Sequence, residues 1–231
     1  MADILVCNHL KKQYGNFTAL KSINLELPEG KVIGLLGPNG SGKTTLIKLA
    51  SGLLLPTAGE ILVGGNHPGI ESKKIVAYLP ERNYLDLNKK ICRQIDFMAD
   101  FYKDFDKDRA YEMLERLEID PKRPLKELSK GNREKVQLIL VMSRNAKLYL
   151  LDEPIGGVDP AARDYILETI IKNKPEDATV LISTHLIADV EPVLDEFVFI
   201  QEGDILKHAT VDEVKKDGKT VDGLFREVFR C

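Results

Sequence analysis

The chain has 231 residues, with 33 Lys and Arg against 36 Asp and Glu, so its formal net charge is −3. Hydrophobic residues make up 43% and charged residues 30% of it, which is typical of a globular protein and excludes a disordered or fibrous one. This near-neutral balance argues against nucleic-acid binding, which needs clustered Lys and Arg. The length predicts one large domain, or one domain that carries a subdomain.

Three features indicate the cellular compartment. The nearest candidates for a membrane-spanning helix, 46–55 and 136–142, are short and interrupted and fall below the roughly 18 apolar residues that such a helix needs. The first residues lack the basic and apolar stretches of a secretory signal. The cysteines Cys7, Cys92 and Cys231 are odd in number and far apart, which disfavours a disulfide framework and a zinc site. We therefore expect a cytoplasmic protein.

The first 36 residues predict a β-rich N-terminal region, in which Ile23, Leu25 and Leu27 alternate with polar residues as in a half-buried strand. From Lys43 the apolar residues take helical spacing, and strands then alternate with helices. Further strands are expected at 60–63, 74–79, 148–151, 179–183 and 196–200. This alternation predicts an α/β fold with a mainly parallel sheet.

A helical segment interrupts this alternation between residues 81 and 144. Apolar stripes with helical spacing start at Ile91 and Ala110, and a third helix is expected from about Ser129. We predict a single domain, in which residues 1–80 and 145–231 form the sheet core and 81–144 form an inserted helical subdomain. The stretch from 211 to the end predicts one or two short helices.

The phosphate loop, residues 37–44, carries the strongest chemical signal. Its sequence is Gly37-Pro38-Asn39-Gly40-Ser41-Gly42-Lys43-Thr44. It fits the pattern G-x-x-x-x-G-K-[ST] between an apolar strand and a helix, where glycines let several N–H groups face a polyphosphate. We expect the loop and Thr45 to bind ATP, with Lys43 reaching the β- and γ-phosphates and Thr44 ligating Mg²⁺. A glycine-rich connecting turn is the alternative.

A bound triphosphate also needs a carboxylate for its metal and a group that activates water. Asp152 and Glu153 end an apolar strand at the sheet edge where ligands of open α/β folds bind. Neighbouring residues that leave a strand point in different directions, so we expect Asp152 to hold Mg²⁺ and Glu153 to act on the attacking water. Alternatively, the two residues only open a loop before Pro154.

From Tyr14 to about His185, these motifs and their order resemble the ATP-binding subunit of an ABC transporter. The resemblance implies a P-loop NTPase core with a mainly parallel sheet, an N-terminal antiparallel β subdomain and an inserted helical subdomain. It also implies that two copies, or two homologous subunits, pair head to tail. Each ATP then lies between the phosphate loop of one copy and a signature segment of the other.

The signature segment of this family, LSGGQ, corresponds to Leu128-Ser129-Lys130-Gly131-Asn132. Ser129 and Gly131 match, and the resemblance implies that they present a hydroxyl and a backbone N–H to the γ-phosphate. Lys130 and Asn132 depart from the pattern, which makes the backbone less permissive and adds a positive charge. An ordinary helix cap at Ser129 explains the local sequence equally well.

The resemblance assigns roles to three more polar residues. Glu81 stands where the family has glutamine, and we expect it to ligate Mg²⁺ or its water shell, with a plain surface glutamate as the alternative. His185 matches the switch histidine, which contacts the γ-phosphate or positions Glu153. Asp159 matches the loop that couples the two sites at the dimer interface.

An aromatic residue is expected to stack on the adenine ring. Tyr14 occupies the corresponding place in the family, and packing under the N-terminal sheet is the alternative.

The function that the resemblance implies is ATP hydrolysis that powers transport, of the exporter type, through separate membrane-spanning permease subunits. The protein would then lie on the inner face of the cell membrane, with ATP and Mg²⁺ as cofactors and no nucleic-acid partner. A soluble ABC-type ATPase of cofactor assembly, DNA maintenance or translation shares every motif. A P-loop kinase would need an acceptor-binding lid, and a catalytically dead module would have lost Lys43, Asp152 or Glu153, which are present.

Overall fold

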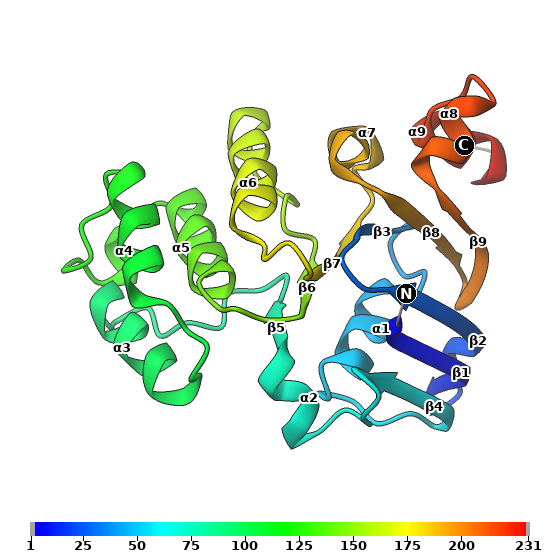
Figure 1. The fold of residues 1–231 in the computed structure, drawn as a ribbon, viewed down its shortest axis with the longest axis horizontal. Helices are drawn as coiled ribbons and strands as arrows, with labels where there is room; N and C mark the ends of the chain where they lie inside the picture. The colour runs from blue at the N-terminus through cyan, green and yellow to red at the C-terminus, as the bar shows by residue number, and fades with distance from the viewer. Residues whose placement is uncertain (1–2, 230–231) are drawn as a thin grey trace.

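A computed structural model of the chain describes residues 3–229, apart from the side chains of residues 161 and 162. Within these residues the strands form two sheets, one in the order β2-β1-β4 and one in the order β5-β6-β7-β3-β8-β9. Figure 1 shows the smaller sheet near the N-terminus and a group of helices at the opposite end of the molecule. The mixed α/β architecture expected from the sequence is confirmed.

The smaller sheet is antiparallel and consists of β1 (Asp3–Tyr14), β2 (Phe17–Pro28) and β4 (Ala58–Val63). The alternation of Ile23, Leu25 and Leu27 is confirmed, because all three side chains are buried. The strand expected at 60–63 was wrongly placed in the parallel series, since it pairs antiparallel with β1. Gly59 permits this pairing, because a Cβ there would lie 2.1 Å from the carbonyl oxygen of His9.

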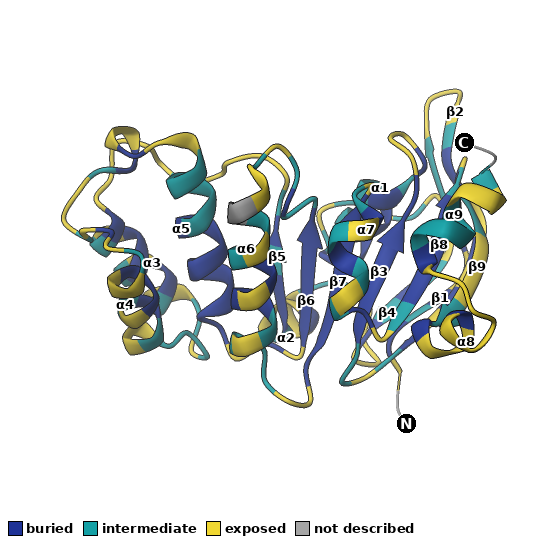
Figure 2. Ribbon diagram, turned by 90° about the horizontal axis from the view of Figure 1, so that it is seen from above, coloured by how far each residue is buried: buried dark blue, intermediate teal, exposed yellow. Residues whose placement is uncertain are grey.

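The larger sheet is parallel except at one edge. Its parallel strands are β3 (Val32–Leu36), β5 (Val76–Leu79), β6 (Leu148–Asp152), β7 (Thr179–Thr184) and β8 (Glu196–Gln201). The edge strand β9 (Asp204–Thr210) is antiparallel to β8. Every residue of β3, β6 and β7 is buried, as Figure 2 shows for the middle of the sheet. This is expected where both faces of a parallel sheet are covered.

Two apolar clusters cover the two faces of this sheet. On β6, Leu148 and Leu150 pack in the cluster that contains α1 (Lys43–Ala50) and the smaller sheet. Tyr149 and Leu151 pack in the other cluster, together with the helices on the opposite face. Because successive side chains of a strand point to opposite faces, each strand of the sheet packs against both clusters.

The strand expected at 74–79 is correct only from Val76 onward. Residues 74 and 75 end a short helix, α2 (Ile70–Ile75), and β5 begins at Val76. The backbone N–H of Gly69 donates to the Ser72 hydroxyl (2.8 Å) at the start of this helix. The guanidinium of Arg144 donates to the carbonyl of Lys74 (3.0 Å) at its end. These contacts stabilise a helical turn that apolar periodicity did not indicate.

The helices predicted between 81 and 144 are present as α3 (Ile91–Phe101), α4 (Lys107–Arg116) and α5 (Lys130–Met142). A 3₁₀ turn, Leu125–Glu127, precedes α5. Ser129 caps α5, because its hydroxyl accepts the N–H of Asn132 at 3.2 Å. Figure 1 shows the three helices together, beyond β5. The subdomain boundaries at 81 and 144 stay a prediction.

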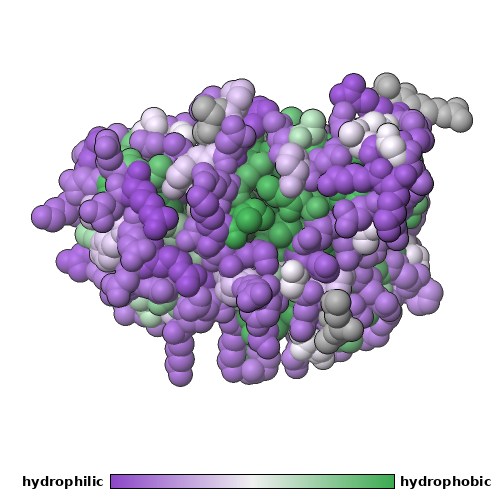
Figure 3. All heavy atoms as spheres, turned by 45° about the horizontal axis from the view of Figure 1, so that its top comes forward, coloured by the Kyte–Doolittle hydropathy of each residue, from purple (hydrophilic) through white to green (hydrophobic). Residues whose placement is uncertain are grey.

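The remaining helices follow the strands of the second half. They are α6 (Pro160–Asn173), α7 (Ile187–Val190), the 3₁₀ turn Glu191–Val193, α8 (Val211–Lys216) and α9 (Val221–Phe229). Across residues 3–229, none of the helices is long and apolar enough to cross a bilayer. Figure 3 shows one face of the molecule with mainly hydrophilic flanks and hydrophobic side chains gathered near its middle.

Candidate active site

The phosphate loop connects the carboxyl end of β3 to the start of α1. Two of its glycines are required by close packing. A Cβ on Gly37 would lie 2.2 Å from the carbonyl oxygen of Ile200, and one on Gly42 would lie 2.8 Å from that of Ala19. Gly42 also has a φ of 113°, which side chains rarely adopt. The loop therefore curls tightly and ends at the N-terminus of α1, an arrangement that favours a bound anion.

Lys43 lies inside this curl with its side chain buried. Its Nζ donates to the carbonyl oxygens of Gly37 (2.7 Å) and Pro38 (3.1 Å) and lies 3.7 Å from Glu153 Oε1. Burial lowers the pKa of Lys43, and the nearby carboxylates of Glu153 and Asp152 oppose that shift. The loop carbonyls thus hold a cation where the loop N–H groups would surround a phosphate.

A cavity of about 390 Å³ opens over the phosphate loop. Residues 39–45 form its floor, and Glu81 and Glu153 also line it. Phe17 and Ala19 of β2 complete the lining. The structure therefore brings the predicted phosphate-binding residues and two of the predicted carboxylates to one cavity.

Asp152 is the last residue of β6 and lies next to Thr44. Its Oδ1 accepts the hydroxyls of Thr44 (3.0 Å) and Ser183 (2.6 Å). Its Oδ2 is buried and has no hydrogen-bond partner among the described residues. A free carboxylate oxygen beside a threonine hydroxyl is the hard oxygen donor set that Mg²⁺ prefers, so these residues fit the metal.

Burial raises the pKa of Asp152, and the hydrogen bonds from Ser183 and Thr44 partly offset the rise. Because the folded-state pKa is raised, the ionised carboxylate destabilises the metal-free fold at neutral pH. This destabilisation is absent below the unfolded pKa of about 3.9 and develops as pH rises through the folded pKa.

The substitution Asp152→Asn should therefore stabilise the metal-free chain, because it removes the buried charge and keeps an oxygen that accepts both hydroxyls. We expect Tm at pH 7 to rise by about 2–4 °C, which corresponds to about 1 kcal/mol. Differential scanning calorimetry checks this against Asp177→Asn, an exposed control. An unchanged or lower Tm for Asp152→Asn would contradict the claim that the ionised Asp152 carboxylate destabilises the metal-free fold.

Glu153 has a backbone conformation that is rare outside glycine, with a φ of 51°. Its N–H donates to the carbonyl of Ser183 (3.0 Å), which ties this conformation to β7. Each of its carboxylate oxygens lies 3.2 Å from Nδ1 of His185. Such strain costs of order 1 kcal/mol and is found at functional sites that the surrounding structure holds in place. The carboxylate is thus positioned over the cavity by two strand ends.

Two other predicted residues, Glu81 and His185, lie around this centre, and Asp159 lies at the start of α6. Glu81 follows β5, and its negative charge contributes to the raised pKa of Asp152. Asp159 immediately precedes α6, where its carbonyl accepts the N–H of Arg163 at 3.1 Å. His185 follows β7 and reaches Glu153 as described.

Two predicted groups lie outside the phosphate-loop cavity. Ser129 and Gly131 are at the N-terminus of α5 and do not line it. Tyr14 lies at the tip of the β1–β2 hairpin, opposite Phe17, and its side chain is 44% exposed. Packing of Tyr14 under the sheet is therefore wrong, and the aromatic residue that lines the cavity is Phe17.

Sequence analysis missed Phe17 and Ser183. The turn Gly15-Asn16 could have indicated Phe17, because it places that residue across a hairpin from Tyr14. Ser183 lies next to the carboxyl end of β7, after three apolar residues, and it pairs directly with Asp152 on β6. That strand neighbourhood was not evident from spacing along the chain.

Comparison with known proteins agrees with this geometry. The family model described as "ABC transporter" matches residues 20–156, more than half of the chain. The chain belongs to the ABC transporter ATP-binding family. It is 32% identical to the uncharacterized ABC transporter ATP-binding protein YhaQ of Bacillus subtilis, over 92% of this chain and 73% of YhaQ.

Another relative and a solved structure extend the comparison. The SkfA peptide export ATP-binding protein SkfE of Bacillus subtilis is 29% identical, over 94% of this chain and 93% of SkfE. A solved ATP-binding subunit of an ABC transporter superposes with a TM-score of 0.88 at 28% identity, over 98% and 99% of the two chains. As an ABC ATP-binding subunit, the chain is an ATPase that binds nucleotide and works with membrane permease partners.

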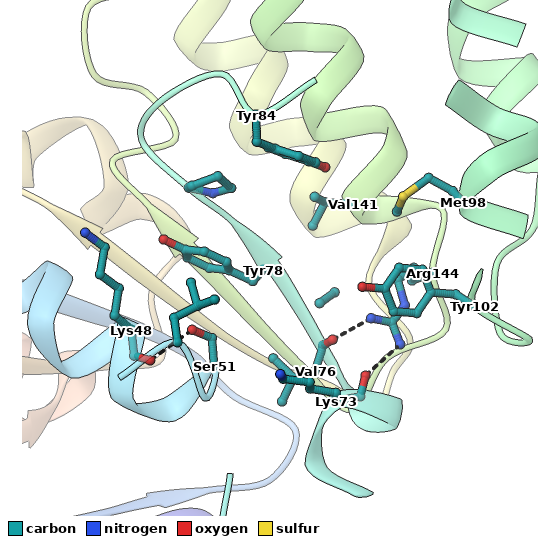
Figure 4. A pocket seen from close by; sticks show the side chains of 13 residues that line it. Lys48, Ser51, Lys73, Val76, Tyr78, Tyr84, Met98, Tyr102, Val141 and Arg144 are labelled. Atoms are coloured by element: carbon teal, nitrogen blue, oxygen red, sulfur yellow. Dashed lines mark hydrogen bonds between the residues drawn. The ribbon is translucent and has the colours of Figure 1, made fainter. Parts of the chain in front are cut away.

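This ABC subunit has a second large cavity, a groove of about 560 Å³, which we call the interdomain groove. Lys48 lines it on the α1 side, and Met98 and Tyr102 line it on the α3 side (Figure 4). Lys73, Tyr78, Tyr84 and Arg144 also face it. The groove thus combines aromatic and apolar side chains with cations, and no carboxylate occurs among the described residues that line it.

Arg144 forms the buried floor of the interdomain groove. Its guanidinium donates to the Asp104 carboxylate (3.0 Å) and to the carbonyl of Val76, and it lies 3.8 Å from the centre of the Tyr102 ring. It therefore ties the segment after α3 to the start of β5. Since β5 leads to Glu81, the groove is joined through one short strand to the nucleotide cavity.

Proposed function

We propose that this chain hydrolyses ATP in a head-to-tail dimer and so drives export through separate membrane-spanning subunits. The observation that carries the proposal is the convergence of Lys43, Thr44, Asp152 and Glu153 on one side of the phosphate loop. Ser129 is exposed at the start of α5, outside this cavity. It would serve a nucleotide held by a second copy, or by a homologous subunit.

Each residue of the site has a proposed role in hydrolysis. The backbone N–H groups of residues 39–45 and the Lys43 side chain bind the phosphates, while Thr44 and Asp152 would hold the metal and Glu81 would contribute to its shell. Mg²⁺, when bound, would supply positive charge that stabilises the negative charge of the phosphates. If the ATPase activity of Glu81→Gln depended on Mg²⁺ as the wild-type activity does, Glu81 would not belong to this set.

Glu153 acts as the general base for the attacking water, and its pair with His185 keeps the carboxylate over the cavity. Tyr14 and Phe17, at the hairpin tip, are the aromatic residues proposed to reach the adenine ring. Asp159 contributes to the dimer interface. Closure of the dimer around ATP and its opening after hydrolysis would supply the motion that the permease uses.

The interdomain groove is the proposed docking site for a cytoplasmic helix of the permease, which places the protein on the inner face of the membrane. Apolar and aromatic residues supply the contact area, and the cations select a helix with carboxylates on its flank. Export is favoured over import by the similarity to SkfE, whose name states peptide export and which aligns over nearly its full length.

Reversing the charge of the groove should separate transport from hydrolysis. For Lys48→Glu/Lys73→Glu we expect several-fold less membrane subunit to copurify from detergent-solubilised membranes, because the two lysines form no ion pair with described residues and would meet the partner's carboxylates. The basal ATPase rate should stay within about twofold, since neither residue touches the phosphate loop cavity. Equal copurification of wild type and variant would contradict the docking site.

A further inference from the structure

Lys130 occupies a signature position where the family has glycine, and its side chain, although 77% exposed, approaches two segments of its own chain. Its Nζ lies 3.7 Å from Glu134 Oε1, one turn further along α5. The same Nζ lies 3.5 Å from the position that a Cβ on Gly157 would take. Gly157 belongs to residues 154–157, which we call the catalytic loop because they follow Glu153. Lys130 therefore bridges α5 and this loop.

The catalytic loop is held in the core at Ile155, which is buried, and lies next to Lys130 at Gly157. It contains two glycines, Gly156 and Gly157, and the latter has a φ of 73°. Gly156 donates its N–H to the carbonyl of Glu153 (3.0 Å), and a Cβ on Gly156 would lie 3.4 Å from the Glu153 Cβ. Because the loop packs directly on Glu153, a shift of its backbone changes the position of the Glu153 carboxylate.

Lys130 and the catalytic centre also face the same hollow. A cavity of about 480 Å³ is lined by Lys130 and Glu134 from α5, and by Glu153, Gly157 and His185 from the strand ends. All of these residues belong to one chain. The contact between α5 and the catalytic loop therefore forms without a second copy.

Glu134 anchors Lys130 in this arrangement. Its side chain is only 25% exposed, and its Oε2 is buried without a hydrogen-bond partner among the described residues. Burial raises the pKa of Glu134, and the adjacent Lys130 opposes that rise. Without the lysine, the half-buried carboxylate would lack its cation, so the two side chains form a mutually dependent pair.

We propose that Lys130 is a positioning residue for the Glu153 of its own chain. Held by Glu134, its ammonium packs on Gly157 and keeps the catalytic loop, and through it the Glu153 carboxylate, in the geometry needed to act on water. The inference rests on the proposed role of Glu153 in hydrolysis. It gives the substituted signature position a function inside the subunit, separate from the γ-phosphate contacts of Ser129 and Gly131.

Steady-state ATPase kinetics test this role. Lys130→Ala should lower kcat by about three- to tenfold and leave KM for ATP within about twofold, because positioning of the base is lost and nucleotide binding is kept. Lys130→Arg should restore kcat, and Glu134→Gln should lower it as Lys130→Ala does. Lys135→Ala is the matched control, since Lys135 lies over the Tyr165 ring and not on the catalytic loop. Wild-type kcat for Lys130→Ala would overturn the proposal.

Mixed dimers distinguish action within the chain from action across the dimer. The Lys43→Ala chain and the Lys130→Ala chain are mixed in equimolar amounts. If Lys130 positions its own Glu153, neither chain carries an intact site, and the mixture should hydrolyse no faster than the two chains measured apart. A severalfold gain on mixing would overturn the proposal, because Lys130 would then act on the nucleotide of its neighbour. Failure of the proposed function gives a different result, because the wild-type chain itself would then hydrolyse no ATP, whereas failure of this inference leaves the wild-type rate in Lys130→Ala.

Discussion

Lys43→Ala is expected to lower the ATPase rate by roughly 10²–10³-fold, the loss typical of one preorganised charge contact to a developing anion. Lys43 is buried, and its ammonium is held by the carbonyl oxygens of Gly37 and Pro38 at the centre of the phosphate loop. No neighbouring lysine among the residues that line the cavity can take its place. The variant should therefore also bind ATP much more weakly, as measured by calorimetric titration.

The control for this substitution lies at the other end of the same strand. Lys31 precedes the amino end of β3, whereas Lys43 follows its carboxyl end, so Lys31→Ala removes the same charge far from the cavity. We expect Lys31→Ala to retain the rate within about twofold. An unaltered rate in Lys43→Ala would overturn the assignment of the phosphate loop.

Glu153→Gln should slow hydrolysis by about 10²–10⁴-fold while ATP binding is preserved, because an amide cannot accept the proton of the attacking water. Glutamine has the same shape as glutamate and can still meet Nδ1 of His185, so the loop geometry should be kept. Single-turnover kinetics with nucleotide-binding measurements separate the two effects. The exposed Glu26→Gln on β2 is the control for loss of one negative charge.

A different outcome would assign the chemistry elsewhere. If Glu153→Gln hydrolysed ATP at the wild-type rate, the base would have to be another group near the cavity, such as Glu81, the other carboxylate among the described residues that line it. If the variant lost ATP binding as well, the substitution would have distorted the catalytic loop, and the loss of activity could not be assigned to the missing base.

The elements that sequence analysis predicted well are those that local pattern determines. The phosphate loop could be predicted because Gly37 and Gly42 occupy positions where close backbone approach or positive φ excludes other residues. Its neighbours β3 and β6 could be predicted because strands covered on both faces are apolar throughout.

The errors concern features that depend on distant residues. The alternation at 58–63 is the same for parallel and antiparallel pairing, so only the partner strand β1 decides the direction. The helix α2 depends on Arg144, about 70 positions away in sequence, which bonds to the carbonyl at its end. The contact between Lys130 and Gly157 likewise joins two segments that no periodicity relates.

The central claim is that one chain supplies the phosphate loop and a second chain completes the ATP site. The molar mass of Glu153→Gln, measured by multi-angle light scattering with and without Mg²⁺ and ATP, tests it most directly. We predict the monomer mass of 25.9 kDa without nucleotide and twice that mass with ATP, because ATP that is not hydrolysed keeps the dimer closed. A chain that binds ATP and remains at the monomer mass would contradict the claim.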